Sequence, residues 1–125
     1  MKGVILKPLV WVRRSKEDLK RFPRPAQSHL GFALKVAQSG GKHPDAKPMR
    51  GFSSVSVIEI VEDFDGNTYR AVYTVRFAEA VYVLHAFQKK SKSGIATPKH
   101  ALDLIEERLK RAKELHALKV HSGRL

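Results

Sequence analysis

The chain has 125 residues, of which 42% are hydrophobic, so it is long and apolar enough to form one domain around its own core. It carries 24 Lys and Arg against 12 Asp and Glu, a net charge of +12, which indicates an anionic partner: nucleic acid first, with a membrane surface or an acidic protein as alternatives. It has no cysteine, which excludes disulfides and thiolate chemistry.

The N-terminal third is typical of a strand followed by two short helices. Lys7-Pro8 interrupts the apolar start, so we expect no signal peptide or membrane span, and a cytoplasmic protein. Residues 9–14 are rich in β-formers, and Ser15 and Asp18 have the spacing of a capping box. The helix that they open must end before Pro23. A second helix begins at Pro25, ends at Ser39-Gly40-Gly41 and places four apolar residues on one face: Leu30, Ala33, Leu34 and Ala37.

The middle of the chain changes from a loop to a run of strands. Residues 40–54 contain glycines, prolines and cations without periodicity, which predicts a long loop that is functional or mobile. Three β-rich segments follow, at 55–61, 68–77 and 80–87. Turn residues separate them, Asp65-Gly66-Asn67 and then Ala78-Glu79, so the pattern predicts a three-stranded antiparallel meander.

A last helix is predicted from Thr97-Pro98, an N-cap and first-turn pair, to about His116. Its apolar stripe consists of Leu102, Ile105, Leu109 and Ala112. We therefore expect a single α+β domain of order βααβββα spanning 1–125, with a core of about 5–116, a frayed tail at 117–125 and the helices gathered on one face of the sheet.

Strand alternation sorts the charges of the meander onto one face. In the 68–77 strand the odd positions, from Tyr69 to Phe77, form the core face. A hairpin through Ala78-Glu79 pairs Phe77 with Ala80, which adds Tyr82, Leu84 and Ala86 to that face. The second face is then a floor of valines, at 55, 57, 61, 81 and 83, that carries Glu59, Arg70, His85, Phe87 and Lys89. A bulge would overturn this assignment, because one extra residue reverses every side chain beyond it.

This face combines a carboxylate, an imidazole and cations on an apolar surface. Such a combination suits phosphodiester cleavage by a ribose 2′-hydroxyl. Glu59 or His85 is the candidate base, and Arg70 is the candidate phosphate clamp because its planar fork binds two oxygens. Lys89 or Lys90 would stabilise charge or transfer a proton. The alternatives are structural: an ion pair between Glu59 and Arg70, a half-buried His85, and a solvated lysine run at 89, 90 and 92.

Metal chemistry is not indicated by the sequence. His43 and His100 have no second ligand at a metal-binding spacing, and we expect no metal and no small-molecule cofactor. A glycine-rich phosphate loop, a nucleophile elbow and a zinc motif are all absent from the sequence.

A series of motifs, in order along residues 5–114, resembles the phage-related, HigB-like branch of the RelE/ParE toxin superfamily. The motifs are KPL (7–9), DLKRFP (18–23), GFALKVAQSG (31–40), AKPMRGF (46–52), VIEI (57–60), YRAVYTV (69–75), VYVLHAFQKKSKSG (81–94) and TP (97–98). The resemblance implies a curved, mainly antiparallel sheet with an N-terminal helical hairpin and a C-terminal helix. It also implies a type II toxin that cuts mRNA in the ribosomal A site, and a helix-turn-helix antitoxin partner.

The resemblance also assigns residues. The family's YR arginine falls on Arg70, the acidic or basic position of the preceding strand on Glu59, and the basic strand end on Lys89 and Lys90. The resemblance also places the family's loop lysine on Lys47 and a base-stacking residue on Phe87. Arg50, Arg76 and Lys92 are further candidate RNA contacts because of their charge. Two other functions stay open: a ParE-like topoisomerase poison that acts by binding, and a non-catalytic RNA-binding module. The Glu and Lys-Lys features speak against the first, since a binder needs no acid-base set.

Overall fold

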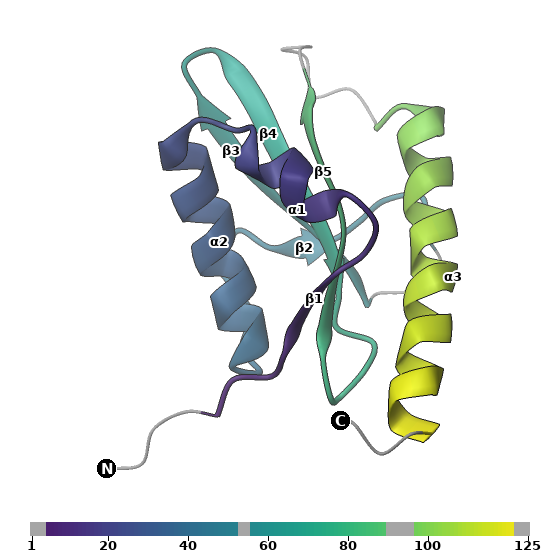
Figure 1. Cartoon of the computed structure of the whole chain (residues 1–125). Helices are drawn as coiled ribbons and strands as arrows, with labels where there is room; N and C mark the ends of the chain where they lie inside the picture. The colour runs from purple at the N-terminus through teal and green to yellow at the C-terminus, as the bar shows by residue number, and fades with distance from the viewer. Residues whose placement is uncertain (1–4, 53–55, 90–96, 122–125) are drawn as a thin grey trace.

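The computed structural model describes residues 5–52, 56–89 and 97–121. In these residues a curved five-stranded sheet of order β1-β5-β4-β3-β2 lies between helices (Figure 1). β1 runs parallel to β5, and the other neighbours are antiparallel, which confirms the expected mainly antiparallel α+β fold. The elements are β1 (Leu9–Trp11), α1 (Ser15–Lys20), α2 (Arg24–Gln38), β2 (Lys47–Pro48), β3 (Val57–Phe64), β4 (Asn67–Thr74), β5 (Val81–Lys89) and α3 (Lys99–His121).

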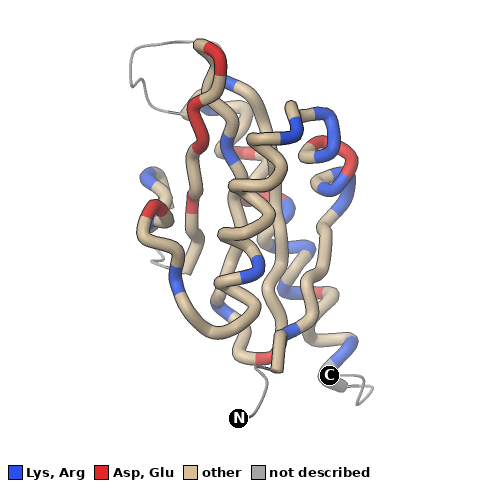
Figure 2. The backbone as a smooth tube through the Cα atoms, turned by 90° about the vertical axis from the view of Figure 1, so that its left-hand side faces the viewer, with Lys and Arg blue, Asp and Glu red and all other residues tan. Residues whose placement is uncertain are grey.

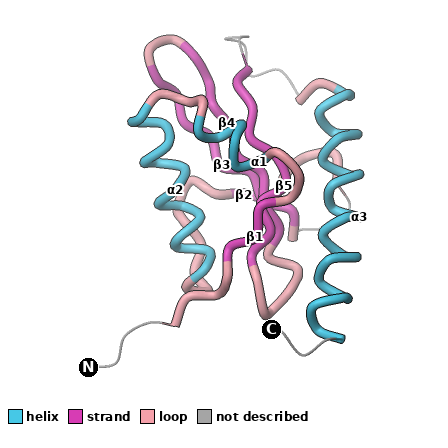
Figure 3. Tube along the Cα trace, in the orientation of Figure 1, coloured by secondary structure: helices cyan, strands magenta, loops and turns pink. Residues whose placement is uncertain are grey.

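Helices cover both faces of the sheet, so the expectation that they gather on one face is wrong. α1 and α2 pack on one face, and α3 lies on the opposite side (Figure 1; Figure 3). The reason is that both sheet faces are apolar, and each must be buried. The α2 face contains Ile58, Ile60, Ala71 and Tyr73, whereas the α3 face contains Val57, Val72, Tyr82 and Leu84.

The turn between β3 and β4 fixes the register of the meander. Asp65 and Gly66 both have positive φ (52° and 80°). A two-residue hairpin turn needs positive φ at both positions to match the twist of the sheet. Phe64 therefore pairs with Asn67, and farther along Glu59 pairs with Val72. This register confirms the predicted sharing of a face between Glu59 and Arg70.

A β-bulge interrupts the pairing of β4 with β5. Val72 pairs with His85, but Tyr73 pairs with Val83, so Leu84 is the extra residue. β4 ends at Thr74, and the predicted pairing of Phe77 with Ala80 does not form. Beyond the bulge the faces are reversed: Tyr82 and Leu84 face α3, whereas Val81 and Val83 face α2, the opposite of the prediction. Ala86 does lie on the α2 face as predicted.

Three local predictions also need correction. Ser15 does not cap α1, because its hydroxyl is buried and donates to the carbonyl of Val83 (3.1 Å). The 40–54 loop contains β2, a short edge strand on β3, and residues 53–55 of that loop lie outside the described residues. α3 begins at Lys99 and continues to His121, beyond the predicted end near His116.

A buried polar cluster ties the C-terminal half of α3 to the sheet. His116 contacts the Tyr82 hydroxyl through Nδ1 (3.0 Å) and Glu79 through Nε2 (2.8 Å), and its ring stacks on Phe77. Tyr82 is fully buried, so we assign this cluster a structural role. Burial raises the pKa of the Tyr82 hydroxyl, and the Glu79 carboxylate adds to that rise, so this group stays protonated at neutral pH.

The charged residues are unevenly distributed along the chain (Figure 2). Four of the 12 acidic residues lie between positions 59 and 65, on β3 and the turn that follows it. Lys and Arg are spread over the helices, the strands and the connecting segments. Among the described residues, every helix is too short or too polar to cross a membrane.

Candidate active site

Glu59, Arg70 and Lys89 form a cluster on the α3 face of the sheet. Alternation along β3, β4 and β5 points all three toward this face, because Arg70 pairs with Phe87 and Thr68 with Lys89. Glu59 Oε2 accepts a hydrogen bond from an Arg70 terminal nitrogen. The side chains are 13% and 14% exposed, so both charges lie at the margin of the core rather than in open solvent.

Two properties of this cluster suit it to bind a phosphate. Arg70 supplies a fixed positive charge that is partly open to solvent, and its buried Nε has no hydrogen-bond partner among the described residues. Burial and the neighbouring Arg70 charge lower the pKa of Lys89, against the opposing effect of Glu59. A lysine with a lowered pKa releases its proton more readily than a solvated one. The cluster therefore combines a carboxylate, a fixed cation and a candidate proton donor.

Lys47 lies next to this cluster. It is exposed on the edge strand β2, where it pairs with Glu59, so the two residues share a sheet face. This position supports its assignment as an RNA contact. The alternating pattern of the long strands could not have predicted that Lys47 lies beside Glu59, because β2 has only two residues and lies within a loop.

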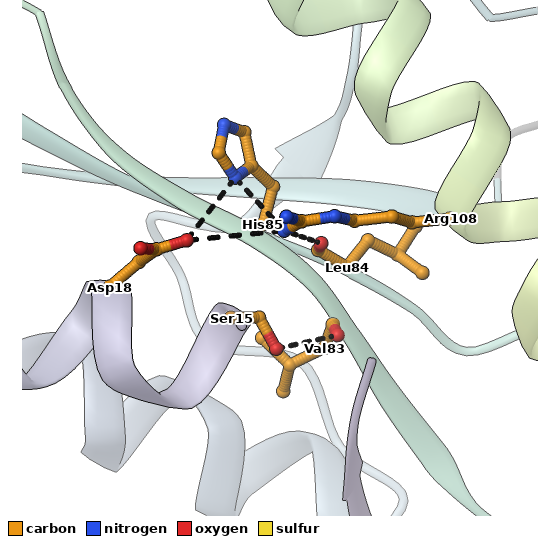
Figure 4. Close-up of polar contacts among 6 residues, drawn as sticks. All are labelled: Ser15, Asp18, Val83, Leu84, His85 and Arg108. Carbon is orange, nitrogen blue, oxygen red and sulfur yellow. Dashed lines mark hydrogen bonds and ion pairs between the residues drawn. The ribbon is translucent and has the colours of Figure 1, made fainter. Parts of the chain in front are cut away.

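His85 belongs to a second group on the same face, with Asp18 and Arg108 (Figure 4). An Arg108 terminal nitrogen donates to the carbonyl of Leu84 (3.0 Å) and lies 3.3 Å from His85 Nδ1. Asp18 Oδ2 lies 4.0 Å from both basic groups. The bulge explains the arrangement, because Leu84 is the extra residue and its carbonyl is free to accept from α3. The His85 ring also stacks on Phe87, with ring centres 4.9 Å apart.

His85 is neutral in this environment. Burial, followed by the Arg108 charge and then by His100, lowers the pKa of His85 to about 4, although the Asp18 carboxylate acts in the opposite direction. A neutral ring with Nδ1 facing an Arg donor carries its hydrogen on Nε2. The lowered pKa makes His85 a weaker base than an ordinary histidine, and Arg108 already faces its Nδ1 lone pair, so the ring is poorly suited to the predicted role of base. Its contacts support the structural interpretation.

The lowered pKa of His85 predicts an acid-sensitive fold. Between pH 6.5 and 4 the unfolded chain binds a proton at His85 that the folded chain does not, so the free energy of unfolding falls as pH falls. The expected loss is about 3 kcal/mol by pH 4, and the contribution is complete above pH 6.5. Urea unfolding of the parent and of His85→Gln across this range measures it. Equal slopes against pH for the two proteins would contradict the assignment.

The other predicted site residues lie apart or outside the described part. Arg76 is exposed beyond the end of β4, in a pocket with Lys110 and Lys113 and without Glu59, Arg70 or Lys89. Arg50 is exposed in the turn after β2. Lys90 and Lys92 lie outside the described residues. The structure thus brings Glu59, Arg70, Lys89 and Lys47 together, and places Arg76 elsewhere.

Sequence reasoning missed Asp18 and Arg108 as site neighbours. A signal for Arg108 exists, because the buried residues of α3 recur at helical spacing and Arg108 occupies one of their positions: Ala101, Ile105, Arg108, Ala112 and His116. A charged residue in such a stripe needs a buried partner. Asp18 gave a misleading signal, since its spacing from Ser15 imitates a capping box.

Known proteins similar to this chain identify its family and its fold. Residues 17–110 match the family model described as phage derived protein Gp49-like (DUF891). The chain belongs to this family. A search of curated proteins gives no match. The family membership agrees with the phage-related resemblance of the sequence motifs.

Solved structures extend the comparison to the fold. A free-state mutant of the Escherichia coli toxin RelE superposes with a TM-score of 0.52 at 17% identity, over 86% of this chain and 98% of that one. The RelBE2 toxin-antitoxin complex of Mycobacterium tuberculosis gives a TM-score of 0.47 at 14% identity, over 73% of this chain and 100% of that one. The RelE match confirms the fold expected from the motifs.

Proposed function

We propose that this Gp49-like protein is the toxin of a type II toxin-antitoxin pair and acts as a ribosome-dependent mRNA endoribonuclease. The observation that carries the proposal is the Glu59–Arg70–Lys89 cluster on one face of a RelE-like sheet. Each residue type matches one requirement of phosphodiester cleavage: a base, a phosphate clamp and an acid. The net charge of +12 supports an RNA substrate.

The cluster suggests how the roles divide. Glu59 accepts the proton of the 2′-hydroxyl, whose oxygen attacks phosphorus and forms a new P–O bond. Arg70 binds the non-bridging oxygens through its guanidinium, where negative charge increases in the transition state. Lys89 gives its proton to the 5′-oxygen as the P–O5′ bond breaks. The products are a 2′,3′-cyclic phosphate and a 5′-hydroxyl end.

The proposed activity implies two kinds of partner for this protein: an mRNA on the ribosome and an antitoxin. The mRNA would lie in the ribosomal A site, with Lys47 at the β2 edge as a backbone contact, and the protein would act in the cytoplasm. A helix-turn-helix antitoxin would block the toxin. Positioning by the ribosome would supply orientation that a small domain lacks, so free RNA should be a poor substrate.

A reconstituted translation reaction tests this proposal. Purified toxin is added to a defined mRNA with initiated ribosomes, and separately to the same mRNA alone. We expect new 5′-hydroxyl ends only in the sample with ribosomes, and none with a Glu59→Gln, Lys89→Met double variant. Salt-sensitive RNA binding without cleavage in both samples would instead establish a non-catalytic RNA-binding module. Inhibition of a topoisomerase with intact mRNA would establish a ParE-like poison.

A further inference from the structure

We propose a transition-metal site, of the zinc class, on the sheet face opposite the Glu59–Arg70–Lys89 cluster. It consists of His29 on α2 and of His43 and Asp45 in the loop before β2, with Glu62 on β3 as a supporting residue. One ligand atom from each of His29, His43 and Asp45 lies within 4.8 Å of the other two. His29, the 43–45 loop and Glu62 are far apart in sequence, and the fold brings them together.

The state of the His29 ring is the main argument. Its Nδ1 lies 3.3 Å from Glu62 Oε1, so the carboxylate favours a proton on Nδ1. Nε2 is then an unprotonated lone pair, and it is buried without a hydrogen-bond partner among the described residues. A proton on Nε2 would also lack a good hydrogen-bond acceptor, because the nearby Asp45 carboxylate oxygen is 3.7 Å from Nε2. A metal ion satisfies this atom.

The contact between His29 and Glu62 has the form found around metal-bound histidines. A ligating imidazole usually donates its other N–H to a carboxylate, which fixes the tautomer and the ring orientation. Glu62 is in that position, with a side chain that is 23% exposed, and alternation along β3 points it away from the Glu59 face. The site therefore has both a coordinating atom and the group that orients it.

The loop residues are arranged to complete the set. The Asp45 backbone amide donates to His43 Nδ1 (3.0 Å), which keeps the two residues beside each other, and a metal ion that binds Nδ1 would replace this hydrogen bond. The rings of His29 and His43 are 5.2 Å apart, and Phe32 packs on the edge of His43. Ligands of tetrahedral zinc are about 3.4 Å from one another. Asp45 is 59% exposed in a loop, so its side chain can move inward by the remaining distance.

The ligand types indicate the class of metal. Two imidazoles and one or two carboxylates favour Zn²⁺, Ni²⁺ or Co²⁺ over Mg²⁺ and Ca²⁺, which prefer all-oxygen sites. A bound ion would join α2, the 43–45 loop and β3. Because Lys47 follows this loop directly and pairs with Glu59, the ion would also hold β2 on the edge of the sheet.

The test uses the purified, untagged full-length chain and does not depend on nuclease activity. Zn²⁺ binding is measured by calorimetry, and Co²⁺ binding by visible absorption, for the parent, His29→Gln, His43→Gln, Glu62→Gln and the control His100→Gln. We expect one ion per chain, a loss of about a hundredfold in affinity for either ligand variant, and about tenfold for Glu62→Gln. His100→Gln, on α3, should match the parent.

Two outcomes would overturn the proposal. One is the absence of saturable one-to-one binding by the parent. The other is equal affinity in the parent and in His43→Gln. His43 is in a loop, so this variant keeps the test valid even if His29→Gln affects folding, and circular dichroism without metal checks both. As a second readout, Zn²⁺ should raise the Tm of the parent and of His100→Gln but not of His43→Gln.

Discussion

Arg70→Ala is expected to lower mRNA cleavage by a factor of about a hundred to a thousand, as removal of one stabilising donor does at oxyanion sites. The physical reason is that Arg70 is the cation in the cluster that contacts Glu59, and its guanidinium would face the negative charge that develops on the phosphate. Expression of the variant should no longer arrest growth. Single-turnover cleavage on initiated ribosomes measures the loss directly.

Two matched variants separate chemistry from folding in this experiment. Arg70→Lys keeps the charge but loses the planar fork, so its activity should fall between those of the parent and the alanine variant. Arg111→Ala removes an exposed arginine that pairs only with Glu114 among the described residues and should leave cleavage unchanged. If a folded Arg70→Ala protein were as active as the parent, the site assignment would be wrong.

Arg108→Ala should have the largest effect on stability, about 3 kcal/mol in the free energy of unfolding. Arg108 is 7% exposed and satisfies the carbonyl of Leu84 at the bulge. Its removal leaves that buried acceptor unpaired, takes the partner charge from Asp18 and deletes the packed aliphatic stem. Urea unfolding at pH 7 measures the change.

Arg111→Ala, on an exposed face of the same helix, is again the matched control and should change stability by at most about 0.5 kcal/mol. A second readout is specific to the contact of Arg108 with His85. Because the Arg108 charge helps to lower the pKa of His85, that pKa should rise in the variant, as followed by NMR titration. Unchanged stability and an unchanged His85 pKa would show that Arg108 does not hold this part of the sheet.

The half of the meander that carries the site could be predicted because its register depends on local features. The Asp65-Gly66 turn sets the pairing of β3 with β4, and the predicted pairing of β4 with β5 holds from Thr68 to Val72. Arg70, Glu59 and Lys89 all lie within this stretch. The bulge comes after it, so Tyr82 and Leu84 were assigned to the wrong face, whereas Glu59, Arg70 and Lys89 were correctly predicted to share one face.

Features that depend on tertiary packing could not be read in this way. Ser15 has the local pattern of a cap, but the carbonyl of Val83 on β5 is its actual partner. The position of α3 on the second face follows from burial of the valines there, which strand alternation shows but sequence order does not. The grouping of His29 with His43 and Asp45 joins a helix to a loop, and no spacing in the sequence indicates it.

Mapping transcript 5′ ends in cells after brief induction tests the central claim most directly. The parent should produce new 5′ ends within translated regions, in phase with codons, and the Arg70→Ala chain, expressed to the same level, should not. Growth arrest by the parent with transcripts that stay intact would contradict the nuclease mechanism and leave toxicity to be explained by binding alone.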